Sequence, residues 1–363
     1  MNKKIKFYID KSLTNKDLPH TPFLFPLWGS QLTDSTPFNV SLFSTYNYDT
    51  DYFCFVENIN DADFLLIPYR YNVLRGKYQE LFNSFIRKSK EYSKPIFIDG
   101  TGDVEYPINY KNVYTLRIGG YRFEKSPNDI HIPPYADDLL ERFCGGDVQV
   151  REKQEVPVVG FAGWARLTTY QRVKSFVKEL LIRITGLYND NYIAKKKGVF
   201  FRMEAIKRLQ KSKLIHTNFL IRKSYSAHTS TAEKNIQELR KEYIDNFINS
   251  DYALCIRGDA NASTRLYEAL SLGRIPVILD TECNFPLEDK LDYKEFSLII
   301  DFRDLPRIDS IIRNFHNTLS NDEFRDMQRK GREVYRNYFR VDALTPYIMA
   351  YLNGFLYDSK NSI

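Results

Sequence analysis

The stretch SDYALCIRGDANASTRLYEALSLGRIPVILD, residues Ser250–Asp280, places a short apolar strand, a polar turn, a helix and a second apolar strand in succession. Tyr252–Ile256 has the length and apolar content of a buried strand. Ser263 is placed to cap the helix that follows it, and Gly273 is typical of the position that ends a helix. Ile275–Leu279 predicts the next buried strand. The stretch therefore predicts a βαβ unit of a parallel sheet.

Polar residues lie at the joints of this unit, where open parallel sheets bind their ligands. The first turn of a helix attracts phosphate through its unpaired N–H groups and its dipole. Arg265 lies in that first turn, and Glu268 follows three residues later on the same helical face. A cation for a diphosphate and a carboxylate for ribose hydroxyls are thus available to one nucleotide. An ordinary surface ion pair is the alternative, and spacing alone does not decide between the two.

The same stretch resembles the donor-site signature of exostosin-like glycosyltransferases (glycosyltransferase family 47), in which an arginine and a glutamate precede an "EAL…G.IPVI" run. Three earlier segments agree with that family in order, namely DADFLLIPYR from Asp61, IHIPPY from Ile130 and VGFAGWAR from Val159. The sequence departs from many members of the family at ANAST, before the helix, and at IDGTGD, which follows an apolar strand.

The resemblance implies an α/β protein of GT-B type, with two Rossmann-like domains that face each other across a cleft. We expect an N-terminal acceptor-side domain at residues 1–150 and a C-terminal nucleotide-sugar donor-binding domain at residues 151–330. A C-terminal helical tail, residues 331–363, is expected to pack back on the N-terminal domain. The charged segment from Gly145 to Pro157 lacks apolar periodicity and is the best linker between the domains.

Apolar strands alternate with amphipathic helices along the chain, which independently predicts parallel sheets covered by helices. Expected strands outside the opening stretch include Ile5–Ile9, Phe64–Pro68, Pro95–Ile98 and the segment VPVVGFAG. Expected helices include Tyr78–Tyr92, Leu167–Ile184, Glu233–Ile248 and much of residues 304–355. In the second of these helices we expect the apolar side chains at helical spacing to point inward: Val173, Phe176, Val177, Leu180 and Leu181.

The resemblance also implies an enzyme, an inverting and metal-independent glycosyltransferase that moves a sugar from a UDP-sugar to a glycan or polysaccharide acceptor. The nucleotide-sugar would be a substrate, with no further cofactor. A GDP-sugar or other nucleotide-sugar donor is one alternative, and a non-catalytic carbohydrate- or nucleotide-binding protein is another. We do not expect a nucleic-acid partner, because 52 Lys and Arg exceed 46 Asp and Glu only slightly and form no long basic block.

Sugar transfer from a nucleotide diphosphate requires cations for the leaving group and a base for the acceptor hydroxyl. We expect these residues at the donor site: Arg166, Arg257, Gly258, Ser263, Thr264, Arg265 and Glu268. Asp99 and Asp103, which flank a glycine turn after an apolar strand, are candidate bases, and Glu105 lies close behind them. An Asx-turn role is the alternative for either aspartate. His131 is a further candidate base, with a structural role as its alternative.

Metal and membrane sites are not expected. Asp61 and Asp63 mimic a metal-binding Asp-x-Asp motif, but they open an apolar strand and match a structural motif of the exostosin-like family. The four cysteines lack the spacing of a zinc site, which predicts free thiols in a reducing compartment. Charged residues interrupt the apolar run at the N-terminus, so neither a secretory signal nor a membrane anchor fits. We therefore expect a cytoplasmic protein, more like a bacterial or viral relative than the Golgi-anchored members of animals and plants.

Overall fold

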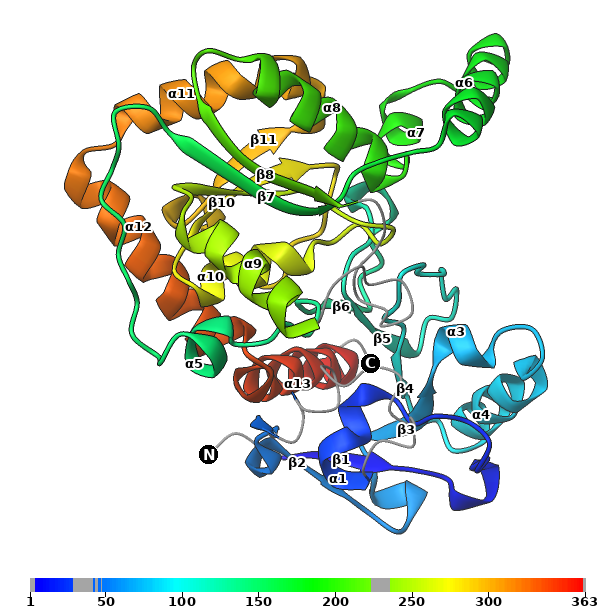
Figure 1. Ribbon diagram of the computed structural model, residues 1–363. Coiled ribbons are helices and arrows are strands. Elements are labelled where there is room, and N and C mark those ends of the chain that lie inside the picture. Colours follow the sequence, from blue (N-terminus) through cyan, green and yellow to red (C-terminus); the bar gives the residue numbers. More distant parts are fainter. Residues whose placement is uncertain (1–3, 29–41, 43–44, 47, 223–235, 362–363) are drawn as a thin grey trace.

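The computed structural model describes residues 4–28, 42, 45–46, 48–222 and 236–361. Its strands form two separate parallel sheets, one from each half of the chain, and helices flank both of them (Figure 1). This arrangement confirms the predicted α/β class with two Rossmann-like domains. Among the residues described, no helix is both long and apolar enough to cross a lipid bilayer.

The first sheet has six parallel strands in the order β2-β1-β3-β4-β5-β6. Its strands are β1 (Ile5–Tyr8), β2 (Phe53–Phe55), β3 (Phe64–Arg70), β4 (Ile96–Asp99), β5 (Val113–Arg117) and β6 (Asp129–His131). Aromatic rings fill the core on one of its faces. Phe7, in β1, is fully buried and stacks on Phe97 with ring centroids 5.4 Å apart, while Phe23 meets Phe97 edge-on. These rings hold the central strands together through apolar contact.

The second sheet has five parallel strands in the order β11-β10-β9-β7-β8. Its strands are β7 (Val158–Trp164), β8 (His216–Arg222), β9 (Tyr252–Cys255), β10 (Ile275–Asp280) and β11 (Leu298–Asp301). The strands β9 and β10 and the helix between them confirm the βαβ unit expected from residues 250–280. All of β9 is buried, as a central parallel strand must be.

Helices connect the strands within each sheet. In the first half of the chain they are α1 (Phe25–Trp28), α3 (Tyr71–Leu74), α4 (Gln79–Glu91) and α5 (Leu139–Phe143). In the second half they are α6 (Thr169–Ile184), α7 (Asp190–Ala194), α8 (Gly198–Lys211), α9 (Ile236–Ile248), α10 (Thr264–Ser271), α11 (Ile308–Thr318), α12 (Asn321–Val334) and α13 (Thr345–Asn361). A π-helical turn, Tyr335–Phe339, follows α12. The start of the predicted helix Glu233–Ile248 lies outside the described residues.

The C-terminal helices divide between the two halves of the molecule. α12 packs against α10, whereas α13 lies beside β1 of the first sheet (Figure 1). Ile348, Met349 and Leu352 of α13 share one core cluster with Ile5 and Phe7. Side chains of α13 and β1 therefore belong to the same hydrophobic core. Residues 145–157, between α5 and β7, contain no helix or strand.

The helix α10 begins and ends where the sequence indicates. Ser263 occupies the N-cap position, although its side chain forms no capping hydrogen bond. At the other end Gly273 has φ +64°, and the N–H of Arg274 donates to the carbonyl of Ala269 at 2.8 Å. Glycine adopts this left-handed conformation without the strain of a side chain, so the chain can turn directly into β10.

The orientation expected for Leu167–Ile184 is wrong. The segment is helical, as α6, but none of its residues is buried. The side chains expected to point inward are all exposed: Val173, Phe176, Val177, Leu180 and Leu181. The spacing of apolar residues defines a helical face, but it does not say what that face meets. Here α6 projects away from the second sheet (Figure 1).

Candidate functional site

The order in which the chain adds strands to the second sheet reverses at β7. β8 lies on one side of this strand and β9 on the other, so the carboxyl ends of β7 and β9 form the topological switch point of the sheet. Ligands of open α/β sheets bind at such points. Two arginines from different helices, Arg202 of α8 and Arg265 of α10, reach these strand ends, and they define what we call the switch-point crevice.

Arg265 comes from the first turn of α10 and lies against β7. Its Nη2 donates to the carbonyl of Ala162 at 2.8 Å, and its guanidinium lies 4.4 Å from the centre of the Phe161 ring. Gly163 permits this approach, because a Cβ there would lie 2.7 Å from Nη2. The guanidinium Nε is buried without a hydrogen-bond partner among the described residues. The structure thus places this predicted donor-site cation at the switch point.

Arg202 connects the two strand ends, and sequence reasoning missed it. Its guanidinium donates to the carbonyl of Trp164 at 3.3 Å and to the carbonyl of Ile256 at 3.0 Å. Trp164 is the last residue of β7, and Ile256 directly follows the last residue of β9. Arg202 lies in the helical segment GVFFRMEAIK, where one arginine among apolar residues carries no motif. Only the topology of the sheet reveals its position.

Glu268 lies one turn beyond Arg265 but has other partners. Its carboxylate accepts a hydrogen bond from the Tyr243 hydroxyl at 2.5 Å and pairs with Arg240 at 3.4 Å, both on α9. Burial, together with the charge of the Glu268 carboxylate, raises the pKa of Tyr243 well above its ordinary value. The phenol therefore stays a donor to Glu268 at neutral pH.

The other predicted donor-site residues have different surroundings. Arg257 is buried, and its guanidinium donates to the carbonyls of Ala194, at 2.8 Å, and Lys196. Burial lowers the pKa of Arg257. The carbonyl of Gly258 accepts the N–H of Gly198 at 3.3 Å, which joins the same loops.

Thr264 and Arg166 are exposed. The side chain of Arg166 forms no hydrogen bond or ion pair within the described part of the chain. Ser263 borders a small cavity between the domains, which Asn284 and Ile118 also line. The predicted donor residues thus divide into Arg265 at the crevice, Glu268 of α10, which is bonded to α9, and the others around the neighbouring loops.

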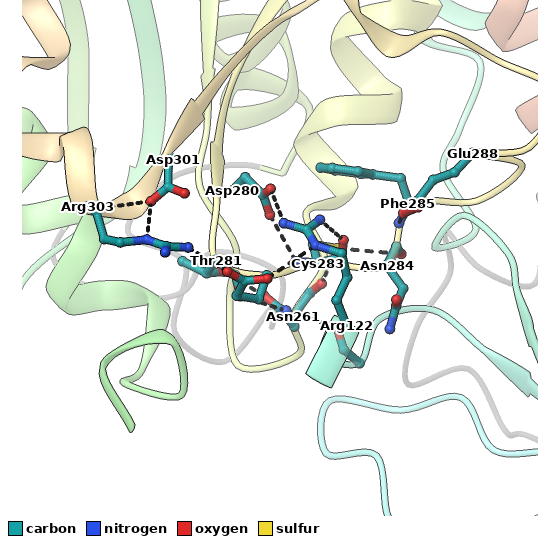
Figure 2. Close-up of polar contacts among 12 residues, drawn as sticks. Arg122, Asn261, Asp280, Thr281, Cys283, Asn284, Phe285, Glu288, Asp301 and Arg303 are labelled. Atoms are coloured by element: carbon teal, nitrogen blue, oxygen red, sulfur yellow. Dashed lines mark hydrogen bonds and ion pairs between the residues drawn. The ribbon is translucent and has the colours of Figure 1, made fainter. Parts of the chain in front are cut away.

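Two loops join the domains next to this cavity. Arg122, from the first domain, donates to the Asp280 carboxylate at 2.5 Å and to the Cys283 carbonyl at 2.6 Å (Figure 2). Asn261, which precedes α10, donates to the carbonyl of Gly120 at 2.9 Å. The contact brings the carboxyl ends of β5 and β10 together.

The four cysteines of the chain, Cys283 among them, are free thiols as predicted.

A cluster of buried polar groups without partners lies under this loop contact. It consists of Glu105, His131 and Asn284, which surround Gly120. A Cβ on Gly120 would lie 3.5 Å from Asn284 Nδ2, 3.7 Å from Glu105 Oε2 and 3.7 Å from His131 Cε1. Glu105 Oε2, both His131 ring nitrogens and both amide atoms of Asn284 are buried without hydrogen-bond partners among the described residues. Such groups are rare in folded proteins, and each calls for an explanation such as a catalytic role or a bound water or ion. We call these residues the Glu105 cluster.

Burial sets the protonation of this cluster. It raises the pKa of Glu105 to about 7, while the N–H of Ile118, which donates to Oε1 at 2.7 Å, opposes the rise. It lowers the pKa of His131 to about 4, so the imidazole is neutral at pH 7. A carboxyl that titrates near neutral pH can accept a proton and release it again.

The two candidate aspartates differ from Glu105. Asp99 is buried and accepts hydrogen bonds from the Thr21 hydroxyl and, at 2.8 Å, from the N–H of Thr101, while Arg70 lies 3.7 Å away. Its bond to Thr101 is an Asx-turn contact, the alternative considered for this residue. Asp103 is exposed, and no hydrogen bond to its side chain is present within the described residues.

The Asp-x-Asp mimic lies elsewhere in the first domain. Asp63 accepts the N–H of Lys6 at 2.9 Å and so joins β3 to β1. Asp63 of the Asp-x-Asp mimic therefore helps to hold two strands together.

Comparison with known proteins concerns mainly the second sheet. The Exostosin GT47 domain matches residues 187–315. A probable glycosyltransferase of Arabidopsis thaliana is 31% identical over 101 residues, which are 28% of this chain and 18% of that protein. A probable glucuronosyltransferase of Oryza sativa subsp. japonica is 37% identical over 70 residues, 19% of this chain and 16% of that protein. The matches therefore span less than a fifth of the length of these relatives.

A solved structure aligns along the whole chain. The crystal structure of a glycosyltransferase from Rickettsia africae covers 98% of this chain and 99% of its own, at 9% identity and a TM-score of 0.42.

Proposed function

We propose, from the match of residues 187–315 to the Exostosin GT47 domain, that the protein is a glycosyltransferase that moves a sugar from a nucleotide-sugar to a glycan acceptor. The observation that carries the proposal is the switch-point crevice. Arg202 and Arg265, both inside that domain, bring two cations to the carboxyl ends of β7 and β9. A nucleotide diphosphate bound there would meet fixed positive charge where its leaving-group charge develops.

We further propose a UDP-sugar donor and a metal-independent mechanism. Arginine side chains neutralise a diphosphate without a metal ion, and the first turn of α10 adds unpaired N–H groups at the same place. Glu268, held by Tyr243, lies one turn further along α10 and is the carboxylate proposed for the ribose hydroxyls. A GDP-sugar would use the same groups, so the choice between the two nucleotides rests on binding measurements.

For the base we propose Glu105. In an inverting displacement, the acceptor oxygen bonds to the anomeric carbon as the bond from that carbon to the diphosphate oxygen breaks, and the base takes the proton of the acceptor hydroxyl. Glu105 lies on the first-domain side of the loop contact, and no described residue forms a hydrogen bond with its Oε2. Arg122 follows Gly120 by two residues and contacts Asp280 of the second domain, so in this proposal the loops separate to admit the acceptor. The predicted base candidates Asp99 and Asp103 lack this combination of burial and a free oxygen.

Thermal unfolding of the purified chain with UDP, GDP, CMP and dTDP tests the donor site. We expect UDP to raise the midpoint of unfolding, and we expect the rise to be lost in Arg265→Ala and Arg202→Ala. Arg307→Ala is the matched control, because the Arg307 side chain is 70% exposed and pairs with Asp304 on the surface. Arg265→Lys keeps a cation if the alanine variant unfolds.

The alternatives give different results. Stabilisation by GDP in place of UDP would change the donor class but keep the crevice. Unchanged UDP stabilisation in both arginine variants would show that the nucleotide binds elsewhere. Nucleotide binding without sugar transfer to any glycan tested would favour a non-catalytic binding protein.

A further inference from the structure

The helix α6 exposes a continuous apolar face. Ile184 is 75% exposed, Tyr170 73% and Phe176 69%. The other members of the face are also exposed: Val173, Val177, Leu180 and Leu181. At 100° per residue these side chains fall within about 140° of the helix surface, which is the breadth of a buried face in a globular protein. No described residue covers it.

The polar side of α6 is the side that contacts the body of the protein. Glu179 accepts hydrogen bonds from Lys196 at 2.7 Å and from the Tyr188 hydroxyl at 2.9 Å. Ser175 and Ile182, which lie near Glu179 on the helix, are less exposed than their neighbours. The pKa of Glu179 is lowered to about 2, because the hydrogen bonds from Lys196, Arg183 and Tyr188 outweigh its burial. The attachment of the helix therefore turns its apolar face away from the second sheet.

Basic side chains border the apolar face. Between residues 166 and 184 the chain has five Lys or Arg and one Glu. On the helix, Lys174 lies at one edge of the apolar face, and Arg172 and Arg183 lie at the other edge. Lys178 lies on the same side as Lys174 but further from the face. An apolar face between basic edges is typical of helices that lie in a membrane surface, where the apolar side enters the acyl region and the cations meet lipid phosphates. We propose that α6 docks the protein on an anionic phospholipid bilayer.

Charge favours a bilayer over a second copy of the chain. Two such helices packed face to face would bring their basic edges together, and like charges across an interface oppose association. The bilayer surface has the opposite charge, worth about 1 kcal/mol for each basic residue near it. The face is also wider than the a/d seam that joins two helices in a coiled coil.

Docking would orient the proposed active site, and this step rests on the proposed function. α6 begins shortly after Trp164, the last residue of β7, whose carboxyl end forms one wall of the switch-point crevice. A helix held in the bilayer surface would keep that crevice close to the membrane. The acceptors then accessible to the enzyme are glycans attached to lipids.

Vesicle flotation of the full chain tests the docking step without any activity measurement. We expect binding to vesicles of phosphatidylcholine with phosphatidylglycerol, and weaker binding to phosphatidylcholine alone. Phe176→Ser with Ile184→Ser should lower the partition constant at least about tenfold, because two large apolar groups no longer enter the acyl region. Leu214→Ser is the control, since this apolar side chain is 42% exposed but lies outside α6.

Charge reversal separates the electrostatic part. Lys174→Glu with Lys178→Glu should lower binding to the anionic vesicles at least about tenfold. Lys207→Glu with Lys241→Glu, two exposed lysines on α8 and α9, makes the same change in net charge and should have a smaller effect. Equal losses in both pairs would overturn the role of α6, as would unchanged binding in the serine variant. A dimer in solution that Phe176→Ser dissociates, without binding to either vesicle, would overturn the bilayer in favour of a second copy. Loss of vesicle binding with nucleotide stabilisation intact would leave the proposed function standing.

Discussion

The turn that ends β4 and the Glu105 cluster present carboxyl groups from the same segment of the first domain in opposite surroundings. In the turn, Asp99 accepts hydrogen bonds from the Thr21 hydroxyl and the Thr101 N–H and forms an ion pair with Arg70 at 3.7 Å. In the cluster, Glu105 accepts a hydrogen bond from the Ile118 N–H, and its Oε2 is buried without a partner among the described residues. A carboxylate whose oxygens are bonded holds the chain together. A carboxylate with a buried oxygen that accepts no hydrogen bond is less stable in its charged form. Its pKa is therefore raised, and it is available for proton transfer.

The largest expected effect is the loss of turnover in Glu105→Gln. The amide keeps the shape of the side chain and cannot accept a proton, so kcat for sugar transfer should fall by about 10²–10⁴-fold. Steady-state kinetics with donor and acceptor would measure it. Asp103→Asn is the control, because Asp103 is exposed and should keep its rate. A normal rate in Glu105→Gln with a low rate in Asp103→Asn would reverse the assignment.

The second effect concerns stability, and it should appear at the other carboxylate. Asp99→Asn removes the negative charge that faces Arg70 and replaces an acceptor oxygen with an amide nitrogen. Because the Arg70 side chain is 35% exposed and keeps its contact with water, the loss comes mainly from the hydrogen bonds to Asp99 and should be about 1–3 kcal/mol of unfolding free energy. Urea unfolding would show it. Glu105→Gln should not lose stability in the same experiment. If Asp99→Asn unfolds the chain entirely, Thr21→Val removes one donor and should give a smaller loss of the same sign.

The contrast between these carboxylates could not be predicted from the sequence. The strand before them, the glycine turn and the position at a carboxyl edge are all visible in IFIDGTGDVE. The partners are not, because Thr21, Ile118 and Asn284 come from distant parts of the chain. The βαβ unit of residues 250–280, in contrast, is local, and its strands, helix and final glycine are predicted correctly. Local periodicity and turn residues thus predict the helices and strands. Which polar groups lack hydrogen-bond partners depends on tertiary contacts, which these patterns do not show.

The helices α4 and α6 show the same limit for apolar patterns. Both have apolar residues at helical spacing, and both are predicted as helices from that pattern. Phe82 and Phe85 of α4 are fully buried, whereas Phe176 of α6 is 69% exposed. A periodic pattern predicts that a face will be covered in the functional state. It does not predict whether that face packs against the rest of the same chain or against a partner.

The third prediction uses pH to separate the two carboxyl groups. Burial raises the pKa of Glu105 from 4.5 to about 7, so the folded chain holds this proton more tightly than the unfolded chain does. Its contribution to stability is therefore present below pH 4.5 and is lost as pH rises to about 7. Glu105→Gln removes this loss, and the variant should gain up to about 3 kcal/mol over the parent chain at pH 8 but little at pH 4.

Unfolding in urea at several pH values would measure this gain. Glu57→Gln is the control, since the Glu57 side chain is 90% exposed and its replacement should change little at any pH. The same titration predicts that transfer activity falls as pH drops below about 7, when the base is protonated. A pH-independent difference between Glu105→Gln and the parent would contradict a raised pKa.

The smallest expected effect comes from the glycine at the centre of the cluster. Gly120 has φ +99° and Gly145 has φ +77°, so alanine at either position meets similar backbone strain, about 1–2 kcal/mol. Their surroundings differ. A Cβ on Gly145 meets nothing within 4 Å, whereas one on Gly120 meets Asn284, Glu105 and His131. Gly145→Ala should therefore lower stability alone, while Gly120→Ala should lower stability by a similar amount and also lower kcat. Because strain is common to both variants, the difference in kcat reports on the space around Glu105. Equal kcat in the two variants would mean that acceptor and base do not meet at this point between the domains, and that the free oxygen of Glu105 has another cause.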